Sequence, residues 1–223
     1  MKDMITSFDK MPLGMYEKIL DICFKQEDDT DDVARLDTQV DIVSILTGMS
    51  RKEILALPLP EYRAMTEKAE FLYDDLLSIK APKLADKYTI GNYTLVPVTD
   101  YRKLITSQYI DFNTYASSKH GKYGDIVGLL SVILVPEGKV YNEDYDIFDL
   151  QRVLRTSMPV KTAMEISNFF VTSCRKSIAS FLSSSRKEAL RLGKKDRKLK
   201  GELLERIAMT EKALSKSGDG STT

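Results

Sequence analysis

The chain has 223 residues, and its 33 Lys and Arg residues balance 33 Asp and Glu residues, so the formal net charge is zero. This balance excludes a uniformly basic nucleic-acid coat and an all-acidic solvating chain. Hydrophobic residues make up 43% of the sequence, which is enough for a sizeable core, whereas Trp is absent and His occurs once. The composition indicates a soluble, intracellular, globular protein and leaves its function open.

Two cysteines, Cys23 and Cys174, lie far apart and without CxxC spacing. One disulfide is conceivable, but two reduced thiols in a cytoplasmic protein are favoured. The N-terminus lacks the apolar run of a signal peptide. The most apolar run, residues 126–135, is about half as long as a segment that crosses a bilayer. We therefore expect no membrane association.

The first third of the sequence predicts helices. Apolar residues recur at three- and four-residue spacing over residues 13–23, directly after Pro12. The same spacing continues over residues 33–46 and stops near Gly48, a residue that suits a helix C-terminus. These two segments predict two amphipathic helices joined by an acidic loop.

A third helix is predicted by a capping signal. Ser50 and Glu53 have the S-x-x-E form of a capping box, in which both side chains satisfy free backbone amides. This short helix should end before Pro58, because the residue before a proline avoids the helical conformation. A longer helix is predicted over residues 61–77.

The middle of the chain predicts a hairpin. Two β-rich runs, residues 87–90 and 93–96, flank the dipeptide Gly91-Asn92, and both of these residues tolerate positive φ. A second turn is expected at residues 136–139. Helices are predicted over residues 106–118 and 124–135, with a buried strand as the alternative for the second segment.

The last third returns to helical spacing. A short helix is predicted around residues 147–154, and a long one follows Pro159. We expect the serines at 183–185 to break or cap this helix, with continuation over residues 186–192. A charged helix with a narrow apolar stripe is predicted over residues 194–214, and residues 216–223 are expected to be disordered.

Together these elements predict a mainly α fold: a helical bundle with a small antiparallel β-hairpin insertion. We expect an N-terminal helical domain at residues 1–84 and a central and C-terminal helical domain with the hairpin at residues 85–193. Residues 194–223 should form the charged helix and the tail.

No cluster of residues predicts catalysis. His120 lies in a polar, basic loop without a second histidine, so we interpret it as a surface residue. The acidic run at residues 28–32 departs from an EF-hand loop, because position 6 is Val33 and position 12 is Gln39. The glycines form no phosphate-binding motif. We therefore expect no enzyme activity, no cofactor and no metal.

Charge is strongly segregated along the sequence. Residues 21–41 hold eight acidic and two basic residues, a net charge of −6, and residues 175–200 hold ten basic and two acidic residues, a net charge of +8. The basic segment fits three interpretations: phosphate binding, a solvated helix, or docking to an acidic protein surface. The apolar stripe that follows favours protein docking, with nucleic acid the weaker alternative. The predicted partner-binding residues are Arg186, Lys187, Arg191, Lys194, Lys195, Arg197, Lys198, Leu199, Leu203 and Ile207.

Two segments carry a family resemblance. Residues 40–50 read VDIVSILTGMS and are followed by EI at 53–54, LPLPEY at 57–62 and FL at 71–72; residues 99–111 read TDYRKLITSQYID. This pattern, mainly over residues 40–78 and 99–111, resembles the tail assembly chaperones of tailed bacteriophages. The motif residues are of packing and capping types.

The resemblance implies a non-catalytic protein of the host cytoplasm. Such a protein binds the tape-measure protein and the tail-tube subunits during virion morphogenesis and leaves the assembled product. Self-association is a further candidate contact. The alternative function is a structural virion component, namely a connector, tail-completion or internal head protein.

Overall fold

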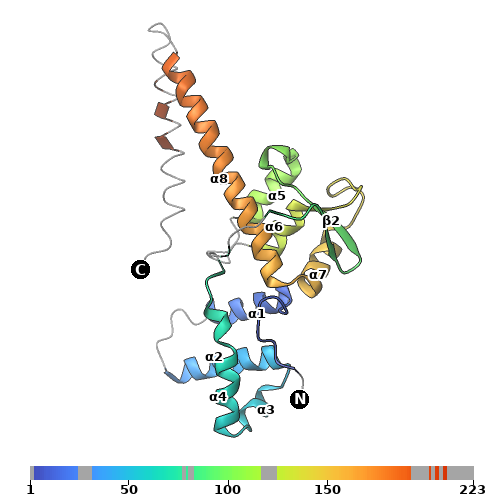
Figure 1. Ribbon diagram of the computed structural model, residues 1–223, viewed down its shortest axis with the longest axis vertical. Coiled ribbons are helices and arrows are strands. Elements are labelled where there is room, and N and C mark those ends of the chain that lie inside the picture. The colour runs from blue at the N-terminus through green and yellow to red at the C-terminus, as the bar shows by residue number, and fades with distance from the viewer. Residues whose placement is uncertain are drawn as a thin grey trace. The chain divides into compact units, whose positions relative to one another are not determined.

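The computed structural model describes residues 3–24, 32–76, 79, 83–116, 125–191, 201, 204–205 and 208–209 (Figure 1). Its contacts define two compact units, Met1–Phe170 and Val171–Thr223. The domain boundaries expected from the sequence, at residues 84/85 and 193/194, remain a prediction that these two units do not test. Helices dominate, with a small antiparallel sheet, so the predicted mainly α fold class is confirmed.

The first unit begins with a group of helices. Their bounds are α1 (Leu13–Phe24), α2 (Asp32–Thr47), α3 (Arg51–Leu55), α4 (Leu59–Lys68) and the 3-10 turn η1 (Glu70–Tyr73). The first two confirm the predicted helices, and Gly48 ends α2 with a φ of +67°. The predicted helix over 61–77 is wrong in extent. Pro58 caps α4, so the helix begins earlier, and the chain tightens into η1 after Ala69.

The capping box at Ser50 is present as predicted. The backbone N–H of Glu53 donates to Ser50 Oγ at 3.3 Å, and the backbone N–H of Ser50 donates to Glu53 Oε2 at 2.7 Å. These reciprocal bonds satisfy two amides that would otherwise lack partners at the start of α3. Arg51, the next residue, pairs with both Asp37 and Asp41 of α2. These two ion pairs link α3 to α2.

The rest of the first unit contains the sheet and its covering helices. In chain order these are β1 (Tyr88–Ile90), β2 (Tyr93–Pro97), the 3-10 turn η3 (Tyr101–Lys103), α5 (Thr106–Ala116), α6 (Ile126–Ile133), β3 (Leu134–Pro136), α7 (Ile147–Ser157) and α8 (Val160–Arg191), which runs on into the second unit. The strands pair antiparallel in the order β1-β2-β3. The predicted hairpin is confirmed, with Gly91 at a φ of +57°.

Two expectations are corrected in this part of the chain. The apolar run that fitted a helix or a strand is both, because α6 passes directly into β3, which pairs with β2. The three serines at 183–185 do not interrupt α8, which continues to Arg191. Serine lowers helix propensity only slightly, so three serines between strong helix formers do not end a long helix.

The N-terminal segment is fastened to the junction between α7 and α8. Leu13 N–H donates to Met158 O at 2.8 Å, and Val160 N–H donates to Met11 O at 2.9 Å. Residues Met11, Leu13 and Met158 are fully buried there. Helix α1 then packs on α7 at one side and on α2 at the other (Figure 1). The N-terminal helices are therefore held to the rest of the first unit through α1.

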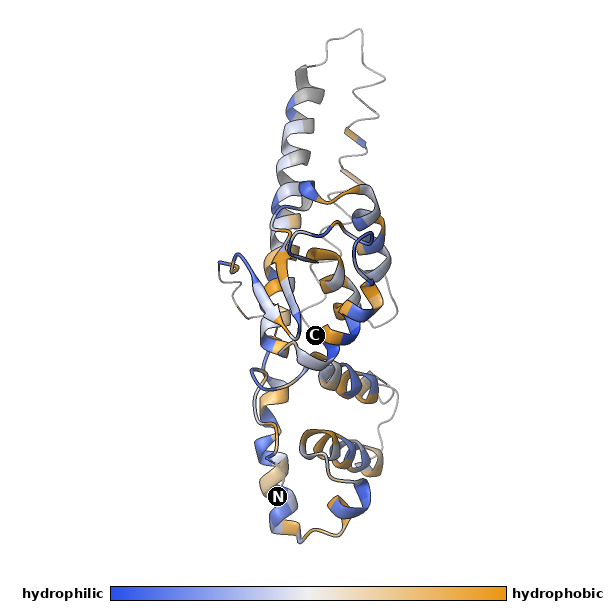
Figure 2. Cartoon of the chain, turned by 90° about the vertical axis from the view of Figure 1, so that its right-hand side faces the viewer, coloured by the Kyte–Doolittle hydropathy of each residue, from blue (hydrophilic) through white to orange (hydrophobic). Residues whose placement is uncertain are grey.

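Two groups of buried side chains stabilise this unit. Helix α6 is buried along most of its length and packs on α5 and α7. A smaller cluster joins α2, α3 and α4 through Val40, Val43, Ile54 and Met65. Figure 2 shows hydrophobic and hydrophilic residues alternating around the helices, as amphipathic packing requires. Within the part of the chain that the structure describes, no helix is long and apolar enough to cross a membrane.

Candidate functional site

The predicted partner-binding surface lies largely beyond the described residues. Lys187 is exposed on α8, and Arg186 and Arg191 belong to the same helix. The remaining predicted residues are outside the described part of the chain: Lys194, Lys195, Arg197, Lys198, Leu199, Leu203 and Ile207. This surface therefore stays a prediction, as do the interpretations of His120 and of residues 28–31, which also lie outside.

The two cysteines are free thiols. Cys23 is exposed at the end of α1, and Cys174 is buried in α8. Partial desolvation raises the pKa of the Cys23 thiol, and burial raises that of Cys174 to about 11. A thiol with a raised pKa holds little thiolate at neutral pH and is a weak nucleophile.

Acidic side chains beside the hairpin are engaged in local interactions. They line an open hollow next to β2 and α7. Their partners are Lys87 for Glu137, the Val140 N–H for Asp144, the Phe148 N–H for Asp146, and both Tyr93 and Arg152 for Asp149. Arg152 lowers the pKa of Asp149. Among the described residues, no three His, Cys, Asp or Glu side chains are grouped to hold a metal ion.

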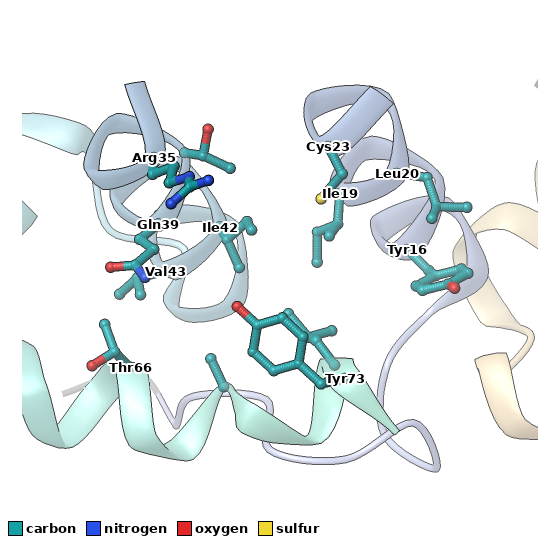
Figure 3. Close-up of a pocket in the computed structure, with 13 residues that line it drawn as sticks. Tyr16, Ile19, Leu20, Cys23, Arg35, Gln39, Ile42, Val43, Thr66 and Tyr73 are labelled. Carbon is teal, nitrogen blue, oxygen red and sulfur yellow. The ribbon is translucent and has the colours of Figure 1, made fainter. Parts of the chain in front are cut away.

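The most distinctive concave feature is an apolar pocket between three helical segments of the first unit. It has a volume of about 380 Å³ and opens between α1, α2 and the α4–η1 segment (Figure 3). Its lining consists of Tyr16, Ile19, Leu20, Cys23, Arg35, Thr38, Gln39, Ile42, Val43, Thr66, Ala69, Leu72 and Tyr73. Volumes of about 300–1,000 Å³ are typical of sites that bind small ligands or anchoring side chains.

Helical spacing explains why these residues share one pocket. Helix α1 contributes positions 16, 19, 20 and 23, and α2 contributes positions 35, 38, 39, 42 and 43. Each set follows the three- and four-residue spacing that places side chains on one face of a helix. Ala69 and Leu72, from the end of α4 and from η1, complete the wall. The pocket thus forms where two amphipathic faces meet a third segment.

The lining is buried at its base and accessible at its edge. Ile19, Val43 and Ala69 are buried, whereas Tyr73 is 83% exposed. Figure 3 shows Tyr73 beside the hollow, with Ile42 of α2 and Ile19 of α1 facing each other across it. An entering apolar group would find packed aliphatic walls and a solvent-facing aromatic ring. Such an arrangement favours binding through hydrophobic burial.

Polar groups gather on the α2 side of the pocket. Thr38 and Gln39 line it there, and among the described lining residues Arg35 carries the only formal charge. No carboxylate and no histidine belongs to the lining, and the Cys23 thiol has a raised pKa. The geometry therefore offers a binding surface and lacks a paired acid and base.

Sequence reasoning identified most of the apolar lining as helix faces but missed the pocket. Apolar spacing predicts Tyr16, Ile19, Leu20 and Cys23 on one face of a helix and Val43 on the face of another. Spacing alone does not tell whether two such faces close completely. The polar residues Arg35 and Gln39 gave no signal, because both are ordinary on the exposed side of a helix.

Protein-family models, curated proteins and solved structures were all searched, and none of them matches the chain.

Proposed function

We propose that this chain is a non-catalytic tail assembly chaperone of a tailed bacteriophage. It would bind the tape-measure protein and the tail-tube subunits in the host cytoplasm and leave before the virion is complete. The observation that carries the proposal is the origin of the pocket. Residues 40–78, which carry most of the resemblance, supply Ile42, Val43, Thr66, Ala69, Leu72 and Tyr73 to its lining.

The second resembling segment has a packing role that suits such a body. Gln108 of α5 is buried, and its Nε2 donates to Val132 O at 3.0 Å while its Oε1 accepts from the Ile105 N–H at 3.2 Å. The bond to Val132 links α5 to α6, and the bond from Ile105 is local to the start of α5. The segment at residues 99–111 therefore contributes to packing, and residues 40–78 contribute accessible residues to the pocket.

Binding of a long helical client is tested by capture. A tape-measure protein of the same phage is co-expressed with the full chain and with a variant that lacks residues 194–223. We expect the full chain to retain the client. The truncated chain should stay folded but fail to bind the client, because most of the predicted partner-binding residues lie in the deleted segment. Failure of the full chain to capture the client would refute the proposal, and unchanged capture by the truncated chain would refute the predicted surface.

The alternative, a structural virion component, makes a different prediction for the purified particle. If the chain is a chaperone, mass spectrometry of purified virions should find it absent or far below the amount of the tube subunit. A stoichiometric amount would instead support a connector, tail-completion or internal head protein.

A further inference from the structure

We infer that the pocket between α1, α2 and the α4–η1 segment binds a small aliphatic carboxylate, with its hydrocarbon chain among the apolar side chains and its carboxylate at Arg35. The ligand belongs to the chemical class of medium-chain fatty acid anions. This inference goes beyond the proposed function and does not depend on it, because it assigns the chain a small-molecule ligand in addition to a protein client.

The pocket has the size and the lining of a small-molecule site. Its volume of about 380 Å³ lies near the lower end of the range that is typical of such sites. Each of its three walls contributes an aliphatic side chain: Ile19 from α1, Ile42 from α2 and Leu72 from η1. Small-ligand sites are lined mainly by apolar side chains and hold a few polar groups that orient the ligand. A short hydrocarbon chain therefore suits this lining.

The charge of the lining determines the head group. Among the described lining residues Arg35 carries the only formal charge, and none of them is a carboxylate. Figure 3 shows Arg35 and Gln39 on the α2 side of the hollow, opposite Ile19 and Cys23 of α1. Arg35 also interacts within the chain, and a guanidinium with five N–H donors can serve more than one acceptor. A carboxylate matches this planar fork of donors better than a hydroxyl or an ammonium group does.

Acidic residues of α2 lie away from the pocket. Asp37 and Asp41 do not line it, and both pair with Arg51 of α3. Helical spacing places positions 35, 39 and 42 on the pocket face of α2, whereas positions 37 and 41 lie on another face. Gln39, one turn after Arg35, adds amide N–H donors on the pocket face. This face of α2 therefore offers donors and a positive charge to a bound anion.

The probes are amphiphiles that differ in one feature at a time. Decanoate, decanol and decylammonium share one chain and differ in charge, and hexanoate has the head group of decanoate on a shorter chain. Binding to the full-length chain is measured by isothermal titration calorimetry, below the concentrations at which the probes form micelles. We expect decanoate to bind at one site and at least about tenfold more tightly than hexanoate, because its additional methylene groups are buried. It should also bind at least about fivefold more tightly than decylammonium, with a difference that shrinks at high salt.

A charge variant tests the head-group assignment. Arg35→Gln should weaken decanoate binding about threefold to fivefold and leave decanol binding unchanged, because only the carboxylate pairs with the guanidinium. Arg35 is exposed, so its replacement leaves the packing of α2 intact. Arg63→Gln is the matched control, since it makes the same change of charge at an exposed position of α4 that does not line the pocket. Equal effects of the two variants on decanoate would overturn the inference.

A filling variant tests the location of the hydrocarbon chain. Thr66 of α4 lines the pocket, so the ring of Thr66→Phe should occupy part of it and weaken both decanoate and decanol at least about tenfold. Thr89→Phe is the matched control, because Thr89 is exposed in β1 and does not line the pocket. Circular dichroism checks that both variants are folded. Unchanged decanoate binding by folded Thr66→Phe would overturn the inference.

The thiols give a readout at the site itself. Cys23 lines the pocket and Cys174 does not, so the alkylation of each is followed by peptide-resolved mass spectrometry. Saturating decanoate should slow alkylation of Cys23 and leave that of Cys174 unchanged. Absence of saturable decanoate binding, or an unchanged rate at Cys23, overturns the inference. A second copy of this chain as the occupant overturns it as well, and would appear as an oligomer that dissociates in the Thr66→Phe variant.

Discussion

The ring of Tyr115 lies directly on the backbone of Gly128. A Cβ atom added to this glycine would be 2.2 Å from Tyr115 Cδ1, far inside van der Waals contact. Tyr115 lies in the last turn of α5 and Gly128 in the first half of α6, so the missing side chain lets these two helices approach closely. The backbone N–H of Asp125, the N-cap of α6, also donates to Tyr115 O at 3.1 Å. A single glycine thus determines how α5 and α6 pack.

We expect Gly128→Ala to destabilise the protein. In an open helix this change would gain about 1 kcal/mol from helix propensity. Here the new methyl group must displace an aromatic ring, and overpacking typically costs about 1–3 kcal/mol. Chemical denaturation of the variant should therefore show a lower free energy of unfolding than the parent.

A double-mutant cycle checks the cause of this loss. In a Tyr115→Ala background the alanine at position 128 should cost much less, because the ring it meets is gone. An equal cost in both backgrounds would show that Tyr115 is not the obstacle.

This contact illustrates what the sequence could and could not predict. Apolar spacing predicted the helices around residues 13–23, 33–46 and 147–154, and S-x-x-E spacing predicted the cap at Ser50, because these signals are local. Gly128 gave no such signal, since its role depends on a ring that packs on it from another helix. The pocket likewise leaves no local signal in the sequence. It depends on how far apart α1 and α2 lie, and that distance is set by tertiary packing.

Serine has opposite expected effects at two positions of this chain. Ser50 accepts from the Glu53 N–H and completes the capping box, so Ser50→Ala should lower the free energy of unfolding by about 1 kcal/mol. Ser183 is exposed inside α8, where alanine is the better helix former, so Ser183→Ala should be neutral or slightly stabilising. Denaturation curves of the two variants test the pair. A loss at Ser183 as large as that at Ser50 would contradict an uninterrupted α8.

Gln151 of α7 holds a buried polar network together. Its Nε2 donates to Tyr115 Oη and to Ser131 Oγ, both at 3.1 Å, and Ser131 Oγ donates to Gly128 O at 2.7 Å. Gln151 and Ser131 are both buried. Gln151→Leu should cost about 1–3 kcal/mol, because it leaves the buried Ser131 hydroxyl and the half-buried Tyr115 hydroxyl with one partner fewer each. This loss would be measured by urea denaturation.

A double variant removes Gln151 together with its partner Ser131. Gln151→Leu combined with Ser131→Ala should cost less than the sum of the two single changes, because replacing both partners leaves fewer buried polar atoms unsatisfied. Strict additivity would indicate that the two side chains do not interact in solution.

Tyrosines near the start of α7 make stability depend on alkaline pH. Burial raises the pKa of Tyr145 to about 12, above the value of 10.0 for a free phenol. Burial also raises the pKa of Tyr141, whose hydroxyl donates to Asp111 Oδ2 at 2.9 Å. Between pH 10 and pH 12 the unfolded chain loses the Tyr145 proton while the folded chain keeps it. The resulting stabilisation is therefore fully present below pH 10 and is lost as the pH rises through 12.

Each such phenol should lower the free energy of unfolding by about 1.4 kcal/mol per pH unit within this window. Tyr145→Phe should make the alkaline loss of stability shallower between pH 10 and pH 12, as followed by urea denaturation at a series of pH values. Tyr73→Phe, at an 83% exposed position, is the control and should leave the slope unchanged. Tyr141→Phe should differ from both by losing stability already at neutral pH, because its bond to the Asp111 carboxylate is gone. Parallel curves for the parent and Tyr145→Phe would show that this phenol is equally acidic in the folded and unfolded chains.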